Sequence, residues 1–177
     1  MNRRESNSLC LECGLCCNGA IFADVQLQPG DDPGRLQSLG LKFVANRKSQ
    51  IVNRKFAQPC AAFAGCKCTV YSERPTYCRE FECLLLKSVK TGQAKPAEAI
   101  RTIQAALRRV KKVKRLLQQL GDADDTIALS KRFRRMKRKL ESGPLERETA
   151  HIFGELTLAV HDLNVLTSER FYPAAPS

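Results

Sequence analysis

The chain has 177 residues, of which 43% are hydrophobic and 6% aromatic, and its 30 Lys and Arg residues against 18 Asp and Glu give a net charge of +12. This length suits one ordinary domain or two small ones, and the absence of tryptophan predicts a largely aliphatic core. No segment approaches the roughly 18 consecutive apolar residues of a membrane span. The basic start MNRRESNSL is not followed by an apolar run, so we expect a cytoplasmic protein without a secretory signal peptide.

Short elements and turns dominate the first half of the chain. The segment QPGDDPG (28–34) predicts a turn, and the apolar stretches at 42–44 and 50–52 predict short strands. Further on we expect a short strand, a turn at Arg74-Pro75 and then one helix through YCREFECLLLKSV. Because long apolar segments are few here, we expect a metal site to help hold this half together.

The second half predicts amphipathic helices joined by short links. The first runs over 96–120, with a proline at its first position and a glycine directly after its end. The acidic residues at 122–125 suit the N-terminus of a second helix, whose apolar face extends from Leu129 to Leu140. The third covers about 145–166. Short links between such helices predict an antiparallel hairpin or a three-helix bundle.

Together these elements predict an α+β fold. A small, irregular cysteine-rich metal-binding domain is followed by an α-helical hairpin or three-helix bundle. The predicted limits are 1–92 for the cysteine domain, 93–170 for the basic helical region and 171–177 for a flexible tail. Composition changes at the first boundary, because all nine cysteines lie before it and the Lys/Arg-rich helices follow it.

The crowded cysteines carry the clearest chemical signal. CLECGLCC (10–17) places four thiols within eight residues. A disulfide framework is disfavoured because the expected compartment is reducing and nine is an odd number. The spacing C-x2-C-x2-C occurs around iron–sulfur clusters, while C-x2-C also builds half of a structural zinc site. The predicted metal ligands are Cys10, Cys13, Cys16, Cys17, Cys60, Cys68 and Cys78.

Zinc and iron–sulfur both accept thiolate ligands, so spacing leaves the two open. His151 and His161 lie almost three helical turns apart in the other half of the chain, and they cannot chelate one ion together. An all-thiolate site leans mildly toward iron–sulfur. Side chains of adjacent residues such as Cys16 and Cys17 usually point in different directions. Either one of the two is not a ligand, or the pair serves two sites or two atoms of a cluster. Gly14 and Gly19 would let the backbone wrap closely around a metal.

The motif CxxCGxCC, followed by PC and then CxVYxxRPxxCRxF, resembles the YkgJ-type cysteine-cluster family of zinc- or iron-chelating proteins. Flagellin lysine N-methylase has this type of cluster, and family members are often labelled iron–sulfur oxidoreductases. The resemblance covers roughly residues 10–83 and implies a chelated metal centre, foremost a [4Fe-4S]-type cluster, with zinc as the alternative. A redox or protein-modification role follows by analogy alone. Cys66 and Cys83 lie outside the family's usual set.

Several other residues have a functional and a plainer interpretation. Arg74 and Arg79 flank Cys78, where a guanidinium would donate hydrogen bonds to sulfur and raise a cluster's potential; the alternative is a turn residue and a solvated helix residue. Cys66 and Cys83 are the candidates for a reactive thiol outside the metal site.

Two basic segments, 101–115 and 131–139, each carry seven Lys or Arg. They predict contact with nucleic acid, another polyanion or an acidic protein partner, against the alternative of a solvated helix face. The alternative function for the whole chain is a non-enzymatic zinc protein whose metal is structural and whose basic helices bind the partner. We also expect a redox or protein partner whose identity the sequence does not give, and no contact with a membrane.

Overall fold

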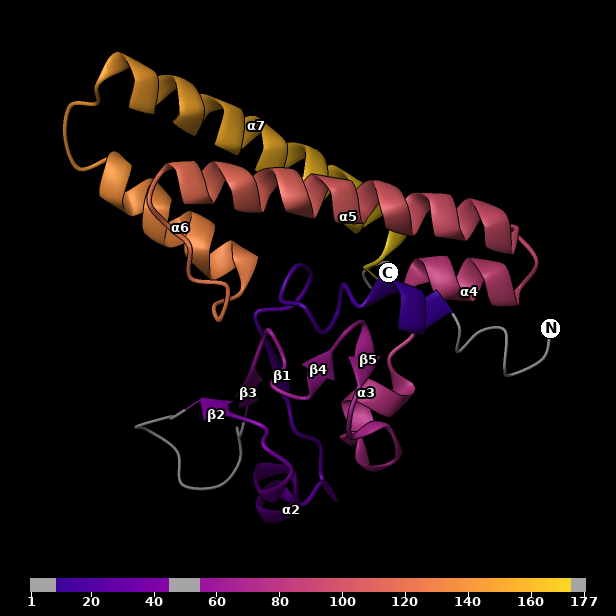
Figure 1. Cartoon of the computed structure of the whole chain (residues 1–177). Helices are drawn as coiled ribbons and strands as arrows, with labels where there is room; N and C mark the ends of the chain where they lie inside the picture. The colour runs from indigo at the N-terminus through magenta and orange to yellow at the C-terminus, as the bar shows by residue number, and fades with distance from the viewer. Residues whose placement is uncertain (1–8, 45–54, 173–177) are drawn as a thin grey trace. The chain divides into compact units, whose positions relative to one another are not determined.

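The computed structural model describes residues 9–44 and 55–172 (Figure 1). Its contacts divide the chain into two compact units. Unit 1 comprises Met1–Cys13, Glu82–Asp124 and Leu129–Ser177, and unit 2 comprises Gly14–Phe81 and Asp125–Ala128. Small antiparallel sheets in unit 2 and long helices in unit 1 confirm the predicted α+β class.

Unit 2 is built on a three-stranded antiparallel sheet of order β1-β3-β2, formed by β1 (Asp24–Gln26), β2 (Phe43–Val44) and β3 (Lys55–Ala57). Phe56 at the centre of β3 is 1% exposed and pairs with Val25 on one side and Phe43 on the other. The strand predicted at 42–44 is thus present as β2, while the one predicted at 50–52 lies outside the described residues.

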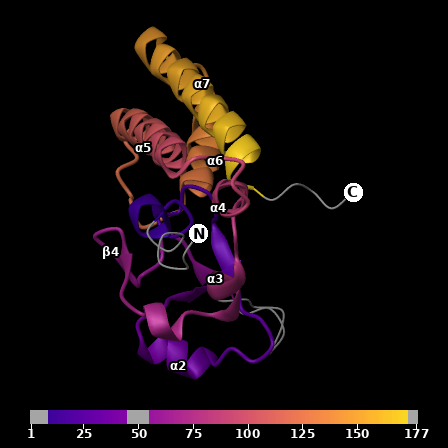
Figure 2. The same ribbon diagram turned by 90° about the vertical axis from the view of Figure 1, so that its right-hand side faces the viewer.

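Short elements complete unit 2. Helix α2 (Pro33–Ser38) starts inside the predicted turn segment, because Asp32 accepts a hydrogen bond from the Arg35 N–H and caps it. A hairpin of β4 (Phe63–Ala64) and β5 (Lys67–Cys68) is followed by the 3-10 turn η1 (Tyr71–Glu73) and by α3 (Thr76–Glu80). Figure 2 shows α2, α3 and β4 from a second side. The small apolar core of this unit is Val25, Leu36, Leu41, Phe56, Ala62 and Val70, and Cys60, Cys68 and Cys78 pack against it.

The single helix predicted through YCREFECLLLKSV is wrong, because the chain forms two helices there. After α3 the backbone of Phe81 is extended, and α4 (Leu84–Lys90) begins only after Cys83. The break separates two cores: Cys78 packs against the core of unit 2, whereas Leu85, Leu86 and Val89 are buried in unit 1.

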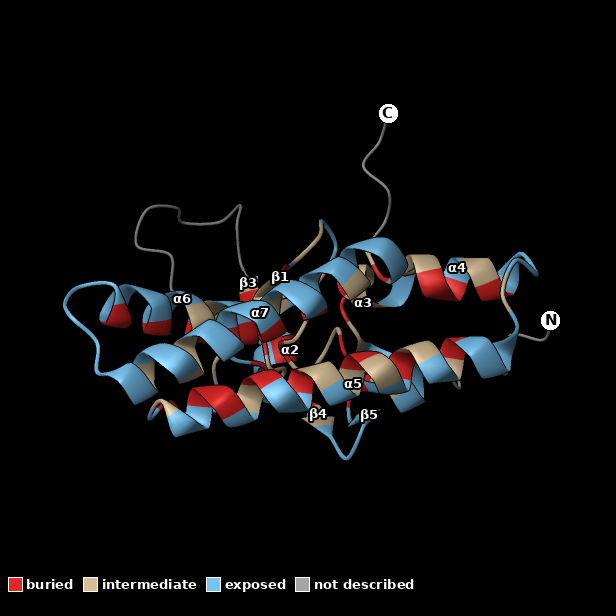
Figure 3. Ribbon diagram, turned by 90° about the horizontal axis from the view of Figure 1, so that it is seen from above, coloured by how far each residue is buried: buried red, intermediate tan, exposed pale blue. Residues whose placement is uncertain are grey.

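Unit 1 consists of helices that pack through their apolar faces. Helix α5 (Pro96–Gln119) lies along α7 (Arg147–Arg170) in the antiparallel sense, α4 contacts both, and α6 (Leu129–Leu140) contacts α5 (Figure 1). Buried residues follow one side of each long helix (Figure 3). These helices confirm the predicted bundle, and α7 extends four residues beyond its predicted end.

The ends of α5 follow the predicted chemistry. Pro96 occupies the first turn, and the Glu98 side chain accepts a hydrogen bond from the Lys95 N–H at 3.3 Å. Gly121, with φ of 85°, follows the C-cap residue and allows the chain to turn away. Phe171 at the end of α7 is 1% exposed, and residues 173–177 of the predicted tail lie outside the described part of the chain.

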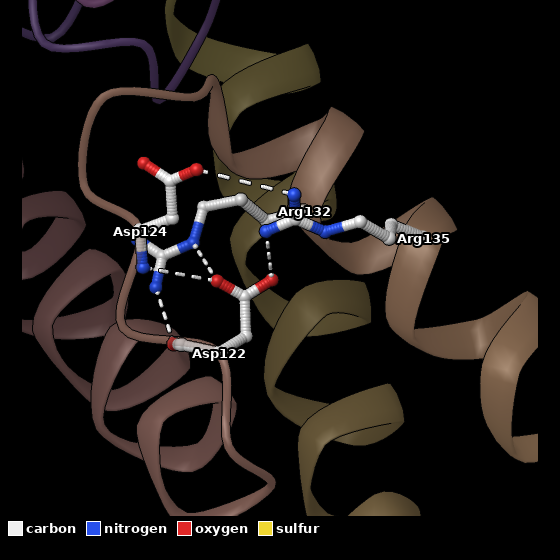
Figure 4. Close-up of polar contacts among 4 residues, drawn as sticks. All are labelled: Asp122, Asp124, Arg132 and Arg135. Carbon is white, nitrogen blue, oxygen red and sulfur yellow. Dashed lines mark hydrogen bonds and ion pairs between the residues drawn. The ribbon is translucent and has the colours of Figure 1, made fainter.

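The acidic residues at 122–125 do not start the second helix, which begins only at Leu129. Asp122 is instead buried at the end of α5 and binds two arginines of α6 (Figure 4). Its Oδ1 accepts from Arg132 Nε at 3.1 Å, its backbone oxygen accepts from Arg132 Nη2 at 2.7 Å, and its Oδ2 accepts from Arg135 Nη2 at 2.8 Å. Two of the seven cations in the second basic segment are therefore partly neutralised by an acid outside that segment.

We expect this carboxylate to make the folded protein sensitive to acid. Burial by itself would raise the pKa of Asp122, but hydrogen bonds from Arg135 and Asp124 and the charges of Arg132 and Arg135 outweigh burial and lower the pKa below 3.8. Because the unfolded chain then binds the proton first, the stabilisation is complete above that value and is lost as the pH falls through the folded-state pKa. Thermal midpoints measured between about pH 5 and pH 2 should fall less steeply in Asp122→Asn.

No helix among the described residues is long and apolar enough to cross a membrane. His151 and His161 are both exposed on α7. The domain limits at 92 and 170 stay a prediction, and α4, which precedes the first limit, belongs to unit 1.

Candidate metal centre

The second half of CLECGLCC forms a tight turn at the start of unit 2. The backbone oxygen of Gly14 accepts hydrogen bonds from the N–H groups of Cys17 and Asn18, both at 2.9 Å. Leu15, which is fully buried, anchors the turn, and its oxygen accepts from Ile21 N–H at 3.2 Å. Cys16 and Cys17 therefore leave this turn half-buried, next to a backbone that is held at several points.

Two glycines allow other chain segments to approach this turn. Gly14 has φ of 60°, and a Cβ there would overlap the Phe63 ring. Gly19 has φ of 76°, and a Cβ there would lie 3.0 Å from Cδ of Pro59 and 3.1 Å from Cα of Ala128. Both positions need glycine for conformation and for space. The space is taken by other chain segments, and wrapping of the backbone around a metal stays a prediction.

Cys60 and Cys68 are brought to the turn by backbone hydrogen bonds. The Cys60 N–H donates to the Cys17 oxygen at 2.8 Å, which ties PC directly to the CC pair. The Cys60 oxygen accepts from Phe63 N–H at 3.0 Å, and Phe63 pairs with Cys68 across the β4-β5 hairpin. The three cysteines are thus linked through one continuous backbone network.

Cys78 is placed by α3, whose N-terminus is held by an aspartate far away in the sequence. Asp31 Oδ1 accepts from both the backbone N–H and the hydroxyl of Thr76, each at 2.8 Å, and Oδ2 accepts from Gln28 N–H at 2.8 Å. Partial burial would raise the pKa of Asp31, but these hydrogen bonds and Arg79 outweigh it and lower the pKa. Sequence reasoning missed this role, because the only signal was a turn-forming Asp-Asp pair.

The electrostatics identify which sulfurs are neighbours. Burial, followed by the nearby Cys17, Cys60 and Cys68, raises the pKa of Cys78 to about 12, and Arg74 opposes this in part. Burial and the neighbouring Cys68 likewise raise the pKa of Cys60. These thiols share one partly buried region in which adjacent thiolates repel one another, so a cation is needed for all of them to ionise together.

The donor set fits a thiolate-bound metal centre. Soft sulfur ligands select zinc, Cu(I) or iron–sulfur clusters. No three His, Cys, Asp or Glu side chains in the described residues converge closely enough to hold a single metal ion as they stand. All nine cysteines, each within the described part of the chain, are thiols rather than disulfides. Cys17, Cys60 and Cys68 are close enough to Cys78 to raise its pKa, so these four sulfurs are neighbours.

Aromatic rings line another side of this region. Tyr77 and Phe81 stack with centroids 5.6 Å apart, and the Phe22 ring meets both edge-on at 6.2 and 5.2 Å. Burial, then the neighbouring Cys16 and Cys78, raises the pKa of Tyr77. Cys16 and Cys78 therefore both lie close to the Tyr77 hydroxyl.

The two arginines that flank Cys78 differ in their contacts. The Arg74 guanidinium lies 3.7 Å from the centroid of the Tyr71 ring, donates to the Tyr71 oxygen at 3.1 Å, and lies close enough to Cys78 to favour its thiolate. Arg79 is exposed and donates to the Thr76 hydroxyl at 3.1 Å. Arg74 is consequently the better candidate for a charge interaction with a ligand sulfur, and Arg79 supports the start of α3.

Cys10 and Cys13 belong to unit 1, where residues 9–13 are helical. Their separation of three residues places them on one side of that helical turn. Cys10 is exposed and Cys13 is half-buried. Both stay predicted ligands, and the chain passes directly from Cys13 into the turn that carries Cys16 and Cys17.

Cys66 lies at the exposed tip of the β4-β5 hairpin. Gly65 and Cys66 both have positive φ, of 53° and 65°, which is the conformation of a type I′ turn. A side chain at such a position is strained, so Cys66→Gly should raise the free energy of unfolding by up to about 1 kcal/mol. Urea unfolding would measure this, with Gly65→Ala as the matched control that should lower it. Metal content should be the same in both variants, and its loss in Cys66→Gly would make Cys66 a ligand.

Cys83 caps helix α4. Its Sγ accepts a hydrogen bond from the Leu86 N–H at 3.4 Å, and burial raises the pKa of its thiol. Cysteine is not among the usual capping residues, so sequence reasoning missed this role.

We expect Cys83→Ser to keep the free energy of unfolding within about 0.5 kcal/mol, because a hydroxyl replaces the sulfur as acceptor, and Cys83→Ala to lower it by about 1 kcal/mol. Chemical denaturation of the two variants side by side checks this. Equal stability of both would remove the capping role.

The sequence that carries these cysteines matches a known family. A family model named CxxCxxCC, described as a putative zinc- or iron-chelating domain, matches residues 9–106, more than half of the chain. The chain belongs to the CxxCxxCC family. Comparisons with curated proteins and with solved structures give no match.

Membership of the CxxCxxCC family confirms the resemblance inferred from the cysteine motif, and it makes the chain a metal-chelating cysteine-cluster protein. The family description names zinc and iron alike. The matched region extends past the last cysteine, Cys83, through α4 and into the first half of α5, so the family pattern includes helical residues of unit 1.

Proposed function

We propose that this protein chelates an iron–sulfur cluster of the [4Fe-4S] type in the cytoplasm and has a redox or protein-modification role. One observation carries the proposal. Cys17, Cys60, Cys68 and Cys78 come from three separate chain segments into one partly buried region, where the pKa of Cys78 is raised to about 12. Thiols placed together in this way are poor isolated nucleophiles at neutral pH, but they become good ligands once a cation offsets their charge.

The donor chemistry supports a cluster over a single zinc ion. Thiolates alone hold [4Fe-4S] clusters, whereas zinc sites often include histidine. All seven candidate ligands in the described residues are cysteines. Neither His151 nor His161 is in the cysteine-bearing segments, which also agrees with an all-thiolate cluster.

The protein's own residues would hold and shield the group. The backbone hydrogen bond from Cys60 to Cys17 holds two of the segments that carry candidate ligands together. Asp31 holds the start of the third such segment, α3, through its hydrogen bonds with Thr76. The packed rings of Phe22, Tyr77 and Phe81, which lie next to Cys16 and Cys78, would shield a bound group on that side. The Arg74 guanidinium supplies positive charge near Cys78. A bound cluster would supply one-electron transfer, and such surroundings tune its potential.

A structural zinc ion is the alternative, because zinc held by four cysteines is common and the family description includes it. In that case the metal would only join the segments of unit 2, whose own apolar core is small. A colourless, zinc-containing protein would follow from this alternative.

The decisive experiment is purification without oxygen, followed by a visible spectrum and by counts of iron, zinc and sulfide per chain. About four irons and four sulfides with brown colour would support the cluster. One or two zinc ions in a colourless protein would replace it with the structural alternative. A protein that contains neither metal after anaerobic reconstitution would contradict both.

A further inference from the structure

Almost all the excess charge of this protein lies on two helices. Between them, α5 and α6 carry fourteen Lys and Arg residues against one acid, Glu98, a charge of +13 in a chain whose total is +12. The other residues together are therefore close to neutral, at −1. Charge concentrated in this way indicates a specific basic surface, whereas charge that only keeps a protein soluble would be spread over the chain.

The cations of α5 lie opposite its buried side. Ile103, Val110 and Leu117 repeat at intervals of seven residues on the side packed in the bundle. Arg101, Arg108 and Arg115 repeat at the same interval, displaced by two residues, and are exposed. Lys111 and Lys112 are exposed beside them. At 1.5 Å per residue, this row of cations is about 21 Å long.

Helix α6 presents a second, shorter group. Arg132 and Arg135 bind Asp122, so they do not count as available cations. Arg134, Arg138 and Lys139 are exposed. These two groups together form what we call the basic helical surface: Arg101, Arg108, Lys111, Lys112, Arg115, Arg134, Arg138 and Lys139.

The cations of this surface have no acidic partner in the described part of the chain, since none of them forms an ion pair there. Some cations elsewhere in the described residues are paired with acids. Arg35 pairs with Glu73, Lys55 pairs with Asp24 at 3.1 Å, and Lys90 pairs with Glu82. The basic helical surface thus keeps its charge available for an external anion.

The chemistry of the surface selects among anionic partners. A helix that inserts into a membrane surface needs an exposed apolar side, but the apolar sides of α5 and α6 are buried within unit 1. The one aromatic residue of α5 and α6, Phe133, is half-buried, so these helices offer no fully exposed ring for base stacking. Evenly repeated, exposed cations on helices whose apolar residues face the other way match a regular row of phosphates.

We propose that the basic helical surface binds the phosphate backbone of double-stranded nucleic acid without sequence preference. This binding would place the cysteine-cluster unit of the same chain near nucleic acid. It does not depend on the metal, because the eight cations belong to unit 1 and none is a candidate ligand.

Binding of the full-length protein to a fluorescent DNA duplex of about two helical turns, 20 base pairs, tests the proposal. If the five cations of α5 contact phosphates, log affinity should fall with log salt with a slope of about −4.5, which is about 500-fold between 50 and 200 mM. The triple variant R101Q/R108Q/K112Q should reduce the slope by about 2.7. The matched control K87Q/R147Q/R170Q removes the same charge from α4 and α7 and should change the slope little.

A conservative variant and a stability control complete the test. The variant R101K/R108K should bind as the unchanged protein does, because phosphate contacts here need only charge. Equal thermal midpoints of the triple variant and its control show that folding is intact. Absence of duplex binding at 50 mM salt, equal losses in the triple variant and its control, or binding to anionic lipid vesicles in place of the duplex would each overturn the proposal. Metal content measured in the same samples separates this result from the proposed function.

Discussion

Cys78→Ser should lower the affinity of the protein for its metal by more than about 100-fold, because changes that merely surround a metal ligand already cost 10- to 100-fold. Cys78 has three sulfur neighbours, Cys17, Cys60 and Cys68. Serine has nearly the same volume but is a much weaker ligand for soft metals. The measurement is metal and sulfide content per chain after anaerobic purification, followed by competition with a chelator.

The control for this prediction is built into the same chain. Cys66→Ser changes an exposed hairpin tip and Cys83→Ser changes a helix cap, so both should load metal normally. Cys60→Ser should behave as Cys78→Ser does, since the two sulfurs share a region. Full metal content in Cys78→Ser, or its loss in both controls alike, would contradict the ligand set centred on Cys78.

Asp122→Ala should lower the free energy of unfolding by about 3–5 kcal/mol. The carboxylate is 3% exposed, and it is bound by Arg132, whose side chain is 2% exposed. Removing the acid leaves a buried guanidinium without its counter-charge, which is the costly half of a broken buried pair. Urea denaturation followed by circular dichroism measures the change.

Arg135→Gln is the matched control, because Arg135 binds the same carboxylate from a side chain that is 48% exposed. Its loss should cost no more than about 1 kcal/mol. The double variant Asp122→Leu with Arg132→Met should recover much of the loss, because apolar replacement of a buried pair is often neutral. Equal destabilisation by Asp122→Ala and Arg135→Gln would show that burial of Arg132 is not the cause.

Prediction from sequence succeeded where the signal was local. The limits of α5 were predicted almost to the residue, because Pro96 and Gly121 act through their own backbone conformations. The apolar repeat of α7 likewise needs only helical periodicity. The cysteine motif predicted the family for the same reason, since ligand spacing within one segment is encoded by neighbours in sequence.

Prediction failed where the structure depends on contacts between segments that are far apart in the sequence. The helix expected through YCREFECLLLKSV divides into α3 and α4 because its two apolar sets are buried in different cores. Asp31 and Asp122 looked like turn and helix-start residues. Each instead binds a partner that only folding brings near, Thr76 in one case and Arg132 in the other.

The sequence by itself therefore determined the α+β class, the bundle helices and the cysteine-cluster family. Those features depend on periodicity, capping residues and short-range spacing. Only the tertiary structure decided which thiols are neighbours, that Cys66 lies at a hairpin tip, and that Cys83 caps a helix. Segments many residues apart meet through backbone hydrogen bonds such as Cys60 to Cys17, and no local pattern in the chain records such a meeting.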